Sequence, residues 1–284
     1  MSLVIYKILL LSFVNIVDEA ESTPYIYEES YDDDYEGCRD ETEKEVTEYY
    51  LNNDIENNKN LTLAWDEAIE FFDNWDPPTP NYLDRNTTLA VMAYTGDFIY
   101  SDLNDAVEHG VNKTTKKHYR SVHFLLTKAI QTLNAIQTLS CIRAYRGVMV
   151  EIRPNQGEAF RFGRFASSST DFSTAIRFGD VTFFNITTCH GADISNYSLC
   201  DESEVLIPPY EKFNVKEING GNITLESVDI TVNYRCVPLN GSVERNTMLL
   251  DSSELMTWLQ VPLDESNIYS LYMRNMYSYY LFFY

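Results

Sequence analysis

Basic residues are scarce in this 284-residue chain. Lys and Arg together number 21 against 43 Asp and Glu, which leaves a formal net charge of −22 and a sequence pI of about 4.4. Nucleic-acid binders need clustered Lys and Arg side chains that neutralise phosphates, so the composition argues against this class of protein. An acidic surface attracts exposed Arg or Lys side chains of another protein, and it also simply keeps a secreted protein soluble.

Cysteine and histidine, the usual zinc ligands, are few and scattered. The five cysteines are widely spaced and form no C-x-x-C pair, which disfavours zinc and thioredoxin-like redox sites and favours disulfide bonds. His118 and His123 have no second histidine or carboxylate at a ligand spacing, so we expect them to be surface or helix-cap residues and expect no metal. The cysteines are Cys38, Cys141, Cys189, Cys200 and Cys236.

The apolar run near the N-terminus, residues 8–14, is too short for a membrane-spanning helix. With Lys7 before it, the run is typical of a secretory signal peptide, which we place at residues 1–20; a buried first strand is the alternative. Residues 249–284 form an aromatic tail that makes a weak lipid-anchor signal. Repeated Asn-x-Ser/Thr patterns also favour secretion, and they begin at Asn60, Asn86, Asn112, Asn185, Asn196, Asn222 and Asn240.

The composition and the residue pattern of 21–248 predict a single α+β domain. Its composition, 44% hydrophobic and 14% aromatic, is that of a globular protein. Apolar residues recur at helical spacing in a half that covers about residues 40–139, and short β-rich runs follow in about 140–236. We therefore expect helices packed on a mixed or antiparallel sheet. The predicted strands are 147–152, 181–186, 204–207, 213–218 and 228–232.

The acidic segment 19–48 contains the run Asp32-Asp33-Asp34, and Cys38 follows this run within the same segment. Such a charged segment does not pack unless another part of the chain holds it. A disulfide at Cys38 would hold this segment in place.

The first of three short signals in the β-rich half is Tyr145-Arg146-Gly147. Arg146 begins an apolar strand, and Gly147 allows a backbone to approach a ligand closely. A guanidinium so placed suits bidentate recognition of phosphate. A surface salt bridge is the alternative interpretation of an isolated Tyr-Arg-Gly.

The second and third signals are pairs of polar residues two positions apart. Ser167 and Ser169 alternate, so on a strand both hydroxyls face one way and can contact a ribose or orient a carboxylate. Glu202 and Glu204 would lie about 6 to 7 Å apart on an extended segment, where two carboxylates can stabilise a cationic transition state and accept a proton. A solvated acidic face is the alternative, but the apolar run 205–209 follows directly and is expected to hold Glu204 at the start of a buried strand.

Taken together and in this order, the three signals resemble the R-S-E signature of the vertebrate-type ecto-ADP-ribosyltransferases. The likeness extends over roughly residues 32–236. Outside the three signals it rests on Asp34-Tyr35-Glu36-Gly37-Cys38, Ala90-Val91-Met92-Ala93-Tyr94-Thr95, Leu126-Thr127-Lys128-Ala129-Ile130 and Thr188-Cys189-His190-Gly191.

The resemblance implies an ADP-ribosyltransferase-like fold that binds NAD+ in the cleft without a metal. It places Arg146 on the phosphates and ribose, Ser167 in support of the catalytic glutamate, and Glu204 as that glutamate. Cleavage then passes through an oxocarbenium-like state, as in glycoside hydrolysis. In members that act on arginine, the position of Glu202 handles the incoming guanidinium. The residues expected to contact NAD+ are Tyr145, Arg146, Gly147, Ser167, Ser169 and Phe178.

The family's disulfide pattern implies the pairs Cys38–Cys236 and Cys141–Cys189. Cys200 departs from that pattern, and a buried thiol, an oxidised thiol and a link to another chain are the alternatives for it. The segment 193–201 corresponds to the part of the family that helps to choose the target protein.

The sequence thus predicts an NAD+-dependent mono-ADP-ribosyltransferase that modifies arginine side chains of proteins. We expect it to be secreted or held at the extracellular face of the plasma membrane, with a lipid anchor as its only link to the membrane. An NAD+ glycohydrolase that uses the same cleft, and a secreted binding module without turnover, are the alternatives. The sequence leaves the target protein and the oligomeric state open.

Overall fold

The computed structural model describes residues 25–109 and 117–237. The predicted signal peptide, the predicted anchor tail and the sequons at Asn112 and Asn240 lie outside these residues. Within them, no helix combines the length and the apolar content that crossing a membrane requires.

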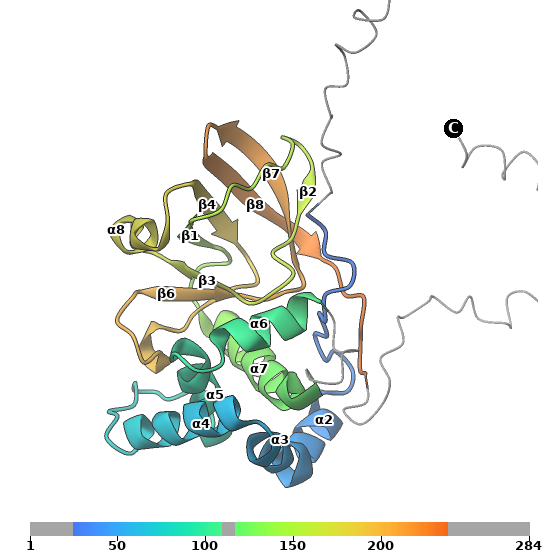
Figure 1. Ribbon diagram of the computed structural model, residues 1–284, viewed down its shortest axis with the longest axis vertical. Helices are drawn as coiled ribbons and strands as arrows, with labels where there is room; N and C mark the ends of the chain where they lie inside the picture. The colour runs from blue at the N-terminus through green and yellow to red at the C-terminus, as the bar shows by residue number, and fades with distance from the viewer. Residues whose placement is uncertain (1–24, 110–116, 238–284) are drawn as a thin grey trace, which may run out of the picture. The chain divides into compact units, whose positions relative to one another are not determined.

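The helical half is built from short helices that pack around one apolar core (Figure 1). Two of them begin at side-chain caps: Asn58 accepts hydrogen bonds from the backbone N–H groups of Asn60 and Leu61, and Asp84 accepts one from Thr87. The predicted helical half, about residues 40–139, is confirmed. The elements are α2 (Arg39–Glu45), the π-helix η1 (Val46–Tyr50), α3 (Leu51–Asn57), α4 (Lys59–Phe72), α5 (Arg85–Thr95), α6 (Tyr100–Glu108), η2 (Lys117–Tyr119) and α7 (Arg120–Ile136).

The second half forms an eight-stranded sheet in the order β2-β7-β8-β4-β1-β3-β6-β5. Neighbouring strands are antiparallel except β4 and β8, so the sheet is mixed and the predicted α+β class is confirmed. The strands are β1 (Ile142–Val148), β2 (Ala159–Phe160), β3 (Ala166–Ser169), β4 (Thr182–Thr188), β5 (Ala192–Asp193), β6 (Glu204–Ile207), β7 (Glu211–Asn219) and β8 (Asn222–Ile230), with α8 (Phe172–Ala175), η3 (Ile176–Phe178) and η4 (Ser195–Tyr197) between them.

Two strand predictions overlap only the last residues of the observed strands. β1 begins at Ile142 and ends at Val148, so residues 149–152 do not continue it, and Met149 and Val150 are exposed. β8 begins at Asn222, directly after the turn from β7, rather than at residue 228.

The short strand β6 is buried on both faces. Leu206 packs into the core of the helical half, and Ile207 packs into a second core with Phe184, Phe213 and Leu225 of the sheet. Because side chains alternate along a strand, β6 joins the two cores. Glu204, at the start of β6, is therefore fixed in position by the packing of the residues that follow it.

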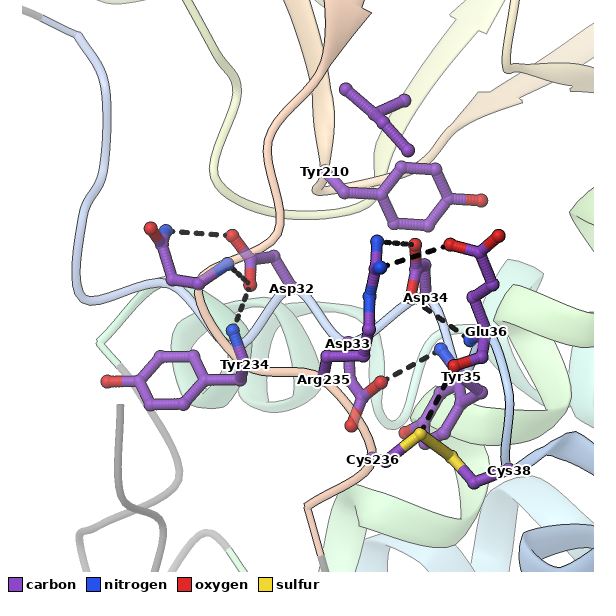
Figure 2. A network of polar contacts seen from close by, with 12 residues as sticks. Asp32, Asp33, Asp34, Tyr35, Glu36, Cys38, Tyr210, Tyr234, Arg235 and Cys236 are labelled. Carbon is purple, nitrogen blue, oxygen red and sulfur yellow. Dashed lines mark hydrogen bonds and ion pairs between the residues drawn. A yellow bond between two sulfur atoms is a disulfide. The ribbon is translucent and has the colours of Figure 1, made fainter. Parts of the chain in front are cut away.

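The acidic run 32–34 is buried, and it lies against the end of the described chain (Figure 2). We call residues 31–38 and 233–237 together the terminal clamp. Asp32 accepts hydrogen bonds from the backbone N–H groups of Asn233 and Tyr234, and Asp33 accepts one from Val237. Burial raises the pKa of Asp33 to about 6. Asp34 pairs with Arg235 at 2.9 Å.

The two disulfides implied by the family resemblance are present, Cys38–Cys236 in the terminal clamp and Cys141–Cys189 at the start of the sheet. The expectation that a disulfide holds the acidic segment is confirmed. Cys200 is free and exposed.

The prediction that His123 is a surface or helix-cap residue is wrong. Its ring is 1% exposed and lies between the hydroxyl of Tyr35, at 2.9 Å, and the carbonyl oxygen of Tyr31, at 3.1 Å. Burial lowers the pKa of His123 to about 3, so the ring is neutral and serves as a core residue. His118 is half-buried, 3.6 Å from Asp54. Within residues 25–109 and 117–237, no group of three or more His, Cys, Asp or Glu is arranged to hold a metal ion.

Candidate active site

Three neighbouring strands bring the sequence-predicted residues into one cavity. β3 lies between β1 and β6, so Arg146 of β1, Ser167 of β3 and Glu204 of β6 come from adjacent strands. All three line a cavity of about 640 Å³. Tyr145, Gly147, Ser169, Phe178 and Glu202 line the same cavity, so the structure brings together every predicted site residue.

Arg146 is half-buried and held by two contacts. Its guanidinium donates to the backbone carbonyl oxygen of Ser167 and lies 3.5 Å from the hydroxyl of Tyr100. The first contact joins β1 to β3, and the second joins the sheet to α6. Arg146 is therefore a positioned side chain of the cavity wall, and the alternative of a surface salt bridge does not hold.

Glu204 is 5% exposed and hydrogen-bonded from two sides. The hydroxyl of Ser198 donates to Oε2 at 3.1 Å, and the hydroxyl of Ser167 also hydrogen-bonds to the carboxyl group. Burial raises the pKa of Glu204 above its usual value, and the two hydroxyls oppose that shift because they stabilise the carboxylate. Nearby Glu202 raises the pKa of Glu204 further, and Arg146 lowers it.

Glu202 and Glu204 share the cavity but not a strand. Ser203, between them, has φ +48°, a left-handed conformation, and β6 begins only at Glu204. The prediction that both carboxylates emerge from one face of an extended segment is therefore wrong. The left-handed residue turns the chain, so that Glu202 reaches the cavity from the loop before β6.

The serine pair also differs from its prediction. Ser167 faces Glu204, but the hydroxyl of Ser169 donates to the backbone carbonyl oxygen of Glu202 at 2.6 Å and accepts a hydrogen bond from the N–H of Asp171. Ser169 thus holds the loop that carries Glu202. Its hydroxyl is engaged by the protein's own backbone.

Gly147 allows a close approach, but to the protein's own chain. A Cβ there would lie 2.1 Å from the carbonyl oxygen of Gly179 and 2.6 Å from that of Ala175. The segment that adjoins β1 so closely carries Phe178, which is 55% exposed and lines the cavity. The ring of Tyr145 packs against aromatic rings beneath the same wall, those of Phe172 and Phe183.

The helical half supplies part of the cavity wall, although the sequence pattern indicated only core helices there. Tyr94 is fully buried; its hydroxyl donates to the carbonyl oxygen of Phe165 at 3.2 Å and accepts from Asn104 at 3.1 Å. The family-like segment 90–95 was a signal for this contribution, because it ends in Tyr94 and Thr95. The helical residues of the wall are Tyr94, Thr95, Gly96, Asp97, Tyr100 and Ser101.

The free Cys200 also lies at this cavity. Partial burial and the neighbouring carboxylates, Glu202 and then Glu204, raise the pKa of its thiol above the usual value. A raised pKa disfavours the thiolate, which is the reactive form of cysteine.

The fold and the cavity define a class of protein, and comparison with known families shows which one. The family model for NAD:arginine ADP-ribosyltransferases matches residues 25–232. The chain therefore belongs to this family, and the family predicted from the sequence is confirmed.

Particular relatives are similar along most of the chain. It is 36% identical over 197 residues to the chicken (Gallus gallus) erythroblast NAD(P)(+)--arginine ADP-ribosyltransferase, covering 66% of this chain and 64% of that protein. It is 34% identical over 238 residues to ecto-ADP-ribosyltransferase 5 of the rat (Rattus norvegicus), covering 76% of each.

Solved structures give the same result. The crystal structure of the mono-ADP-ribosyltransferase ART2.2 matches with a TM-score of 0.67 and 31% identity, over 75% of this chain and 98% of that one. A mutant of ART2.2 in complex with NADH matches with a TM-score of 0.66 and 31% identity, over 74% and 96%. The predicted ADP-ribosyltransferase-like fold is thus confirmed, and so is the enzyme class with NAD+ as its substrate.

Proposed function

We propose that this protein cleaves NAD+ in the cavity and transfers the ADP-ribose to arginine side chains of other proteins. The observation that carries the proposal is the convergence of Arg146, Ser167 and Glu204 on one cavity, with Glu202 in the same wall. The relatives named as arginine ADP-ribosyltransferases support the choice of acceptor.

Arg146 binds the diphosphate and the adjoining ribose. A guanidinium carries five N–H donors in a planar fork, and the two contacts to Ser167 and Tyr100 leave donors for phosphate oxygens. Phe178 supplies an exposed aromatic face for the cationic nicotinamide ring. Tyr145 and Gly147 shape the wall beneath it, and Ser169 holds the loop of Glu202.

Glu204 stabilises the charge that develops when the bond breaks. The bond between the ribose carbon C1′ and the nicotinamide nitrogen breaks, and the neutral nicotinamide leaves with the electron pair. The ribose then carries positive charge, which the buried carboxylate of Glu204 stabilises. Ser167 keeps the carboxylate oriented.

Glu202 prepares the acceptor. An arginine guanidinium is protonated at neutral pH and is a poor nucleophile. A nitrogen of the incoming guanidinium forms a bond to C1′ and loses one proton, which Glu202 accepts. The carboxylates of Asp97, Glu202 and Glu204 in the cavity wall favour a cationic side chain there.

We also propose an extracellular setting for this reaction. The two disulfides fit an oxidising compartment. Four of the sequon asparagines are exposed, as glycan attachment requires: Asn60, Asn185, Asn196 and Asn222. Attachment by a lipid anchor and target choice by the segment 193–201 remain part of the proposal.

The test is a comparison of E204Q and E202Q with labelled NAD+ and agmatine, a free guanidine acceptor. E204Q should abolish both nicotinamide release and ADP-ribosyl-agmatine formation. E202Q should abolish transfer to agmatine and retain part of the NAD+ hydrolysis. Full transfer by E204Q would contradict its role, hydrolysis without transfer by the wild type would indicate a glycohydrolase, and no nicotinamide release at all would indicate a binding module.

A further inference from the structure

Ser198 lies in the segment between β5 and β6, and its hydroxyl contacts the buried carboxylate. The side chain is 9% exposed, and Oγ lies 3.1 Å from Oε2 of Glu204. Sequence reasoning assigned this segment to target choice and gave Ser198 no part in the chemistry. The contact places it beside the group on which bond cleavage depends.

The hydrogen bonding around Ser198 fixes the direction of its hydroxyl. The backbone N–H of Cys200 donates to Oγ at 3.2 Å. A hydroxyl has one hydrogen to donate, and with the N–H of Cys200 on an Oγ lone pair that hydrogen remains for Glu204. Ser198 is thus oriented as a donor to the carboxylate.

The helical half holds the segment on both sides of Ser198. The N–H of Leu199 donates to Oγ1 of Thr95 at 3.0 Å, at the end of α5. The buried ring of Tyr197 hydrogen-bonds through its hydroxyl to Oδ1 of Asn81 at 3.2 Å. These two contacts fix the backbone on either side of Ser198. They therefore keep its hydroxyl beside Glu204.

We propose that Ser198 is a positioning residue that, together with Ser167 of β3, holds the Glu204 carboxylate in its reactive orientation. The inference rests on the proposed function and adds a donor from the segment before β6. It also gives the helical half a part in catalysis, since Thr95 and Asn81 hold the segment that carries Ser198.

Other charged and titratable groups also face Glu204, and the test must leave them in place. They are Arg146 from β1, Tyr94 from α5, and Cys200 and Glu202 from the loop before β6. The substitution S198A removes one donor and changes none of these groups.

The experiment measures the pH profile of nicotinamide release for the wild type, S198A and S198T. Loss of one donor to a buried carboxylate should lower kcat about 10-fold and move the acid limb upward by about one pH unit, with KM for NAD+ unchanged. S198T keeps a hydroxyl and should restore most of kcat. The matched control is S195A, because Ser195 lies in the same segment but contacts Asp193 and the backbone oxygen of Glu204.

A second measurement does not depend on turnover. A carbon-13 NMR titration of the Glu204 carboxyl, assigned by its loss in E204Q, should show a higher pKa in S198A than in the wild type or S195A. An unchanged acid limb and an unchanged carboxyl titration in folded S198A would overturn the proposal. Failure of the proposed function is distinct, because the wild type would then release no nicotinamide while the titration still reports on Ser198.

Discussion

Gly147 and Gly179 pack backbone against backbone. A Cβ on Gly147 would lie 2.1 Å from the carbonyl oxygen of Gly179, and a Cβ on Gly179 would lie 2.3 Å from the carbonyl carbon of Val148. The two glycines thus let the chain after η3 run directly along β1, which brings Phe178 to the cavity. The glycine of the Tyr-Arg-Gly signal, Gly147, is therefore required by this packing against Gly179.

We expect G147A to be destabilising, because the atoms that the new Cβ would meet are backbone atoms that cannot rotate away. The free energy of unfolding should fall by about 1–3 kcal/mol, and KM for NAD+ should rise as Phe178 shifts. The matched control is G96A in the same wall, where the Cβ would meet the end of the Glu67 side chain. Denaturant unfolding and NAD+ kinetics on both variants check this, and an equal loss in both would contradict it.

We expect E204Q to abolish activity and to make the folded protein more stable at neutral pH. Burial raises the pKa of Glu204, so the fold binds the proton more tightly than the unfolded chain does. The stability that this proton contributes is complete below 4.5, the ordinary value, and is lost as pH rises through the folded-state pKa.

Glutamine does not ionise, so the free energy of unfolding of E204Q should exceed that of the wild type by on the order of 1 kcal/mol at pH 7. The gain should shrink toward zero as the pH approaches 4. Thermal unfolding of both proteins across this range is the measurement. A variant that is less stable than the wild type at pH 7 would show that the carboxylate is stabilised, not strained, by its site.

We expect the ion pair between Asp32 and Arg161 to be strongly coupled to folding. Both side chains are 0% exposed, with Oδ2 and Nη2 2.7 Å apart. D32N leaves the buried guanidinium of Arg161 without a counter-charge, so the free energy of unfolding should fall by about 3–5 kcal/mol. E151Q breaks the exposed pair with Arg153, 60% and 77% exposed, and should cost under about 1 kcal/mol. Denaturant unfolding separates the two, and similar losses would contradict the prediction.

Much of the fold could be predicted because its signals are local. The apolar face of α7 and the change to β-rich runs near residue 140 gave the two halves correctly, and the run 204–207 gave β6 with its bounds. The roles of Arg146 and Glu204 came from the family resemblance. Spacing alone predicted an extended Glu-x-Glu pair, which the left-handed Ser203 does not form.

The remainder depends on partners far along the chain. A run of three aspartates indicates a solvated segment, yet it is buried because distant partners satisfy it: Arg161 pairs with Asp32, and backbone donors at Asn233, Tyr234 and Val237 follow some 200 residues later. His123 is buried for the same reason, since Tyr31 and Tyr35 cover it from the terminal clamp. No local pattern around either position contains this information.

The terminal clamp can form only after the C-terminal part of the domain has been synthesised. Its disulfide joins residues 198 positions apart, and the backbone donors for Asp32 and Asp33 are among the last described residues to leave the ribosome. Until they emerge, Asp32 and Asp33 lack these backbone donors and keep only partners made earlier, Arg161 for Asp32 and the N–H of Tyr35 for Asp33. A nascent chain that stops short of Asn233 therefore already contains every residue of the cavity wall, yet it cannot close the domain around it.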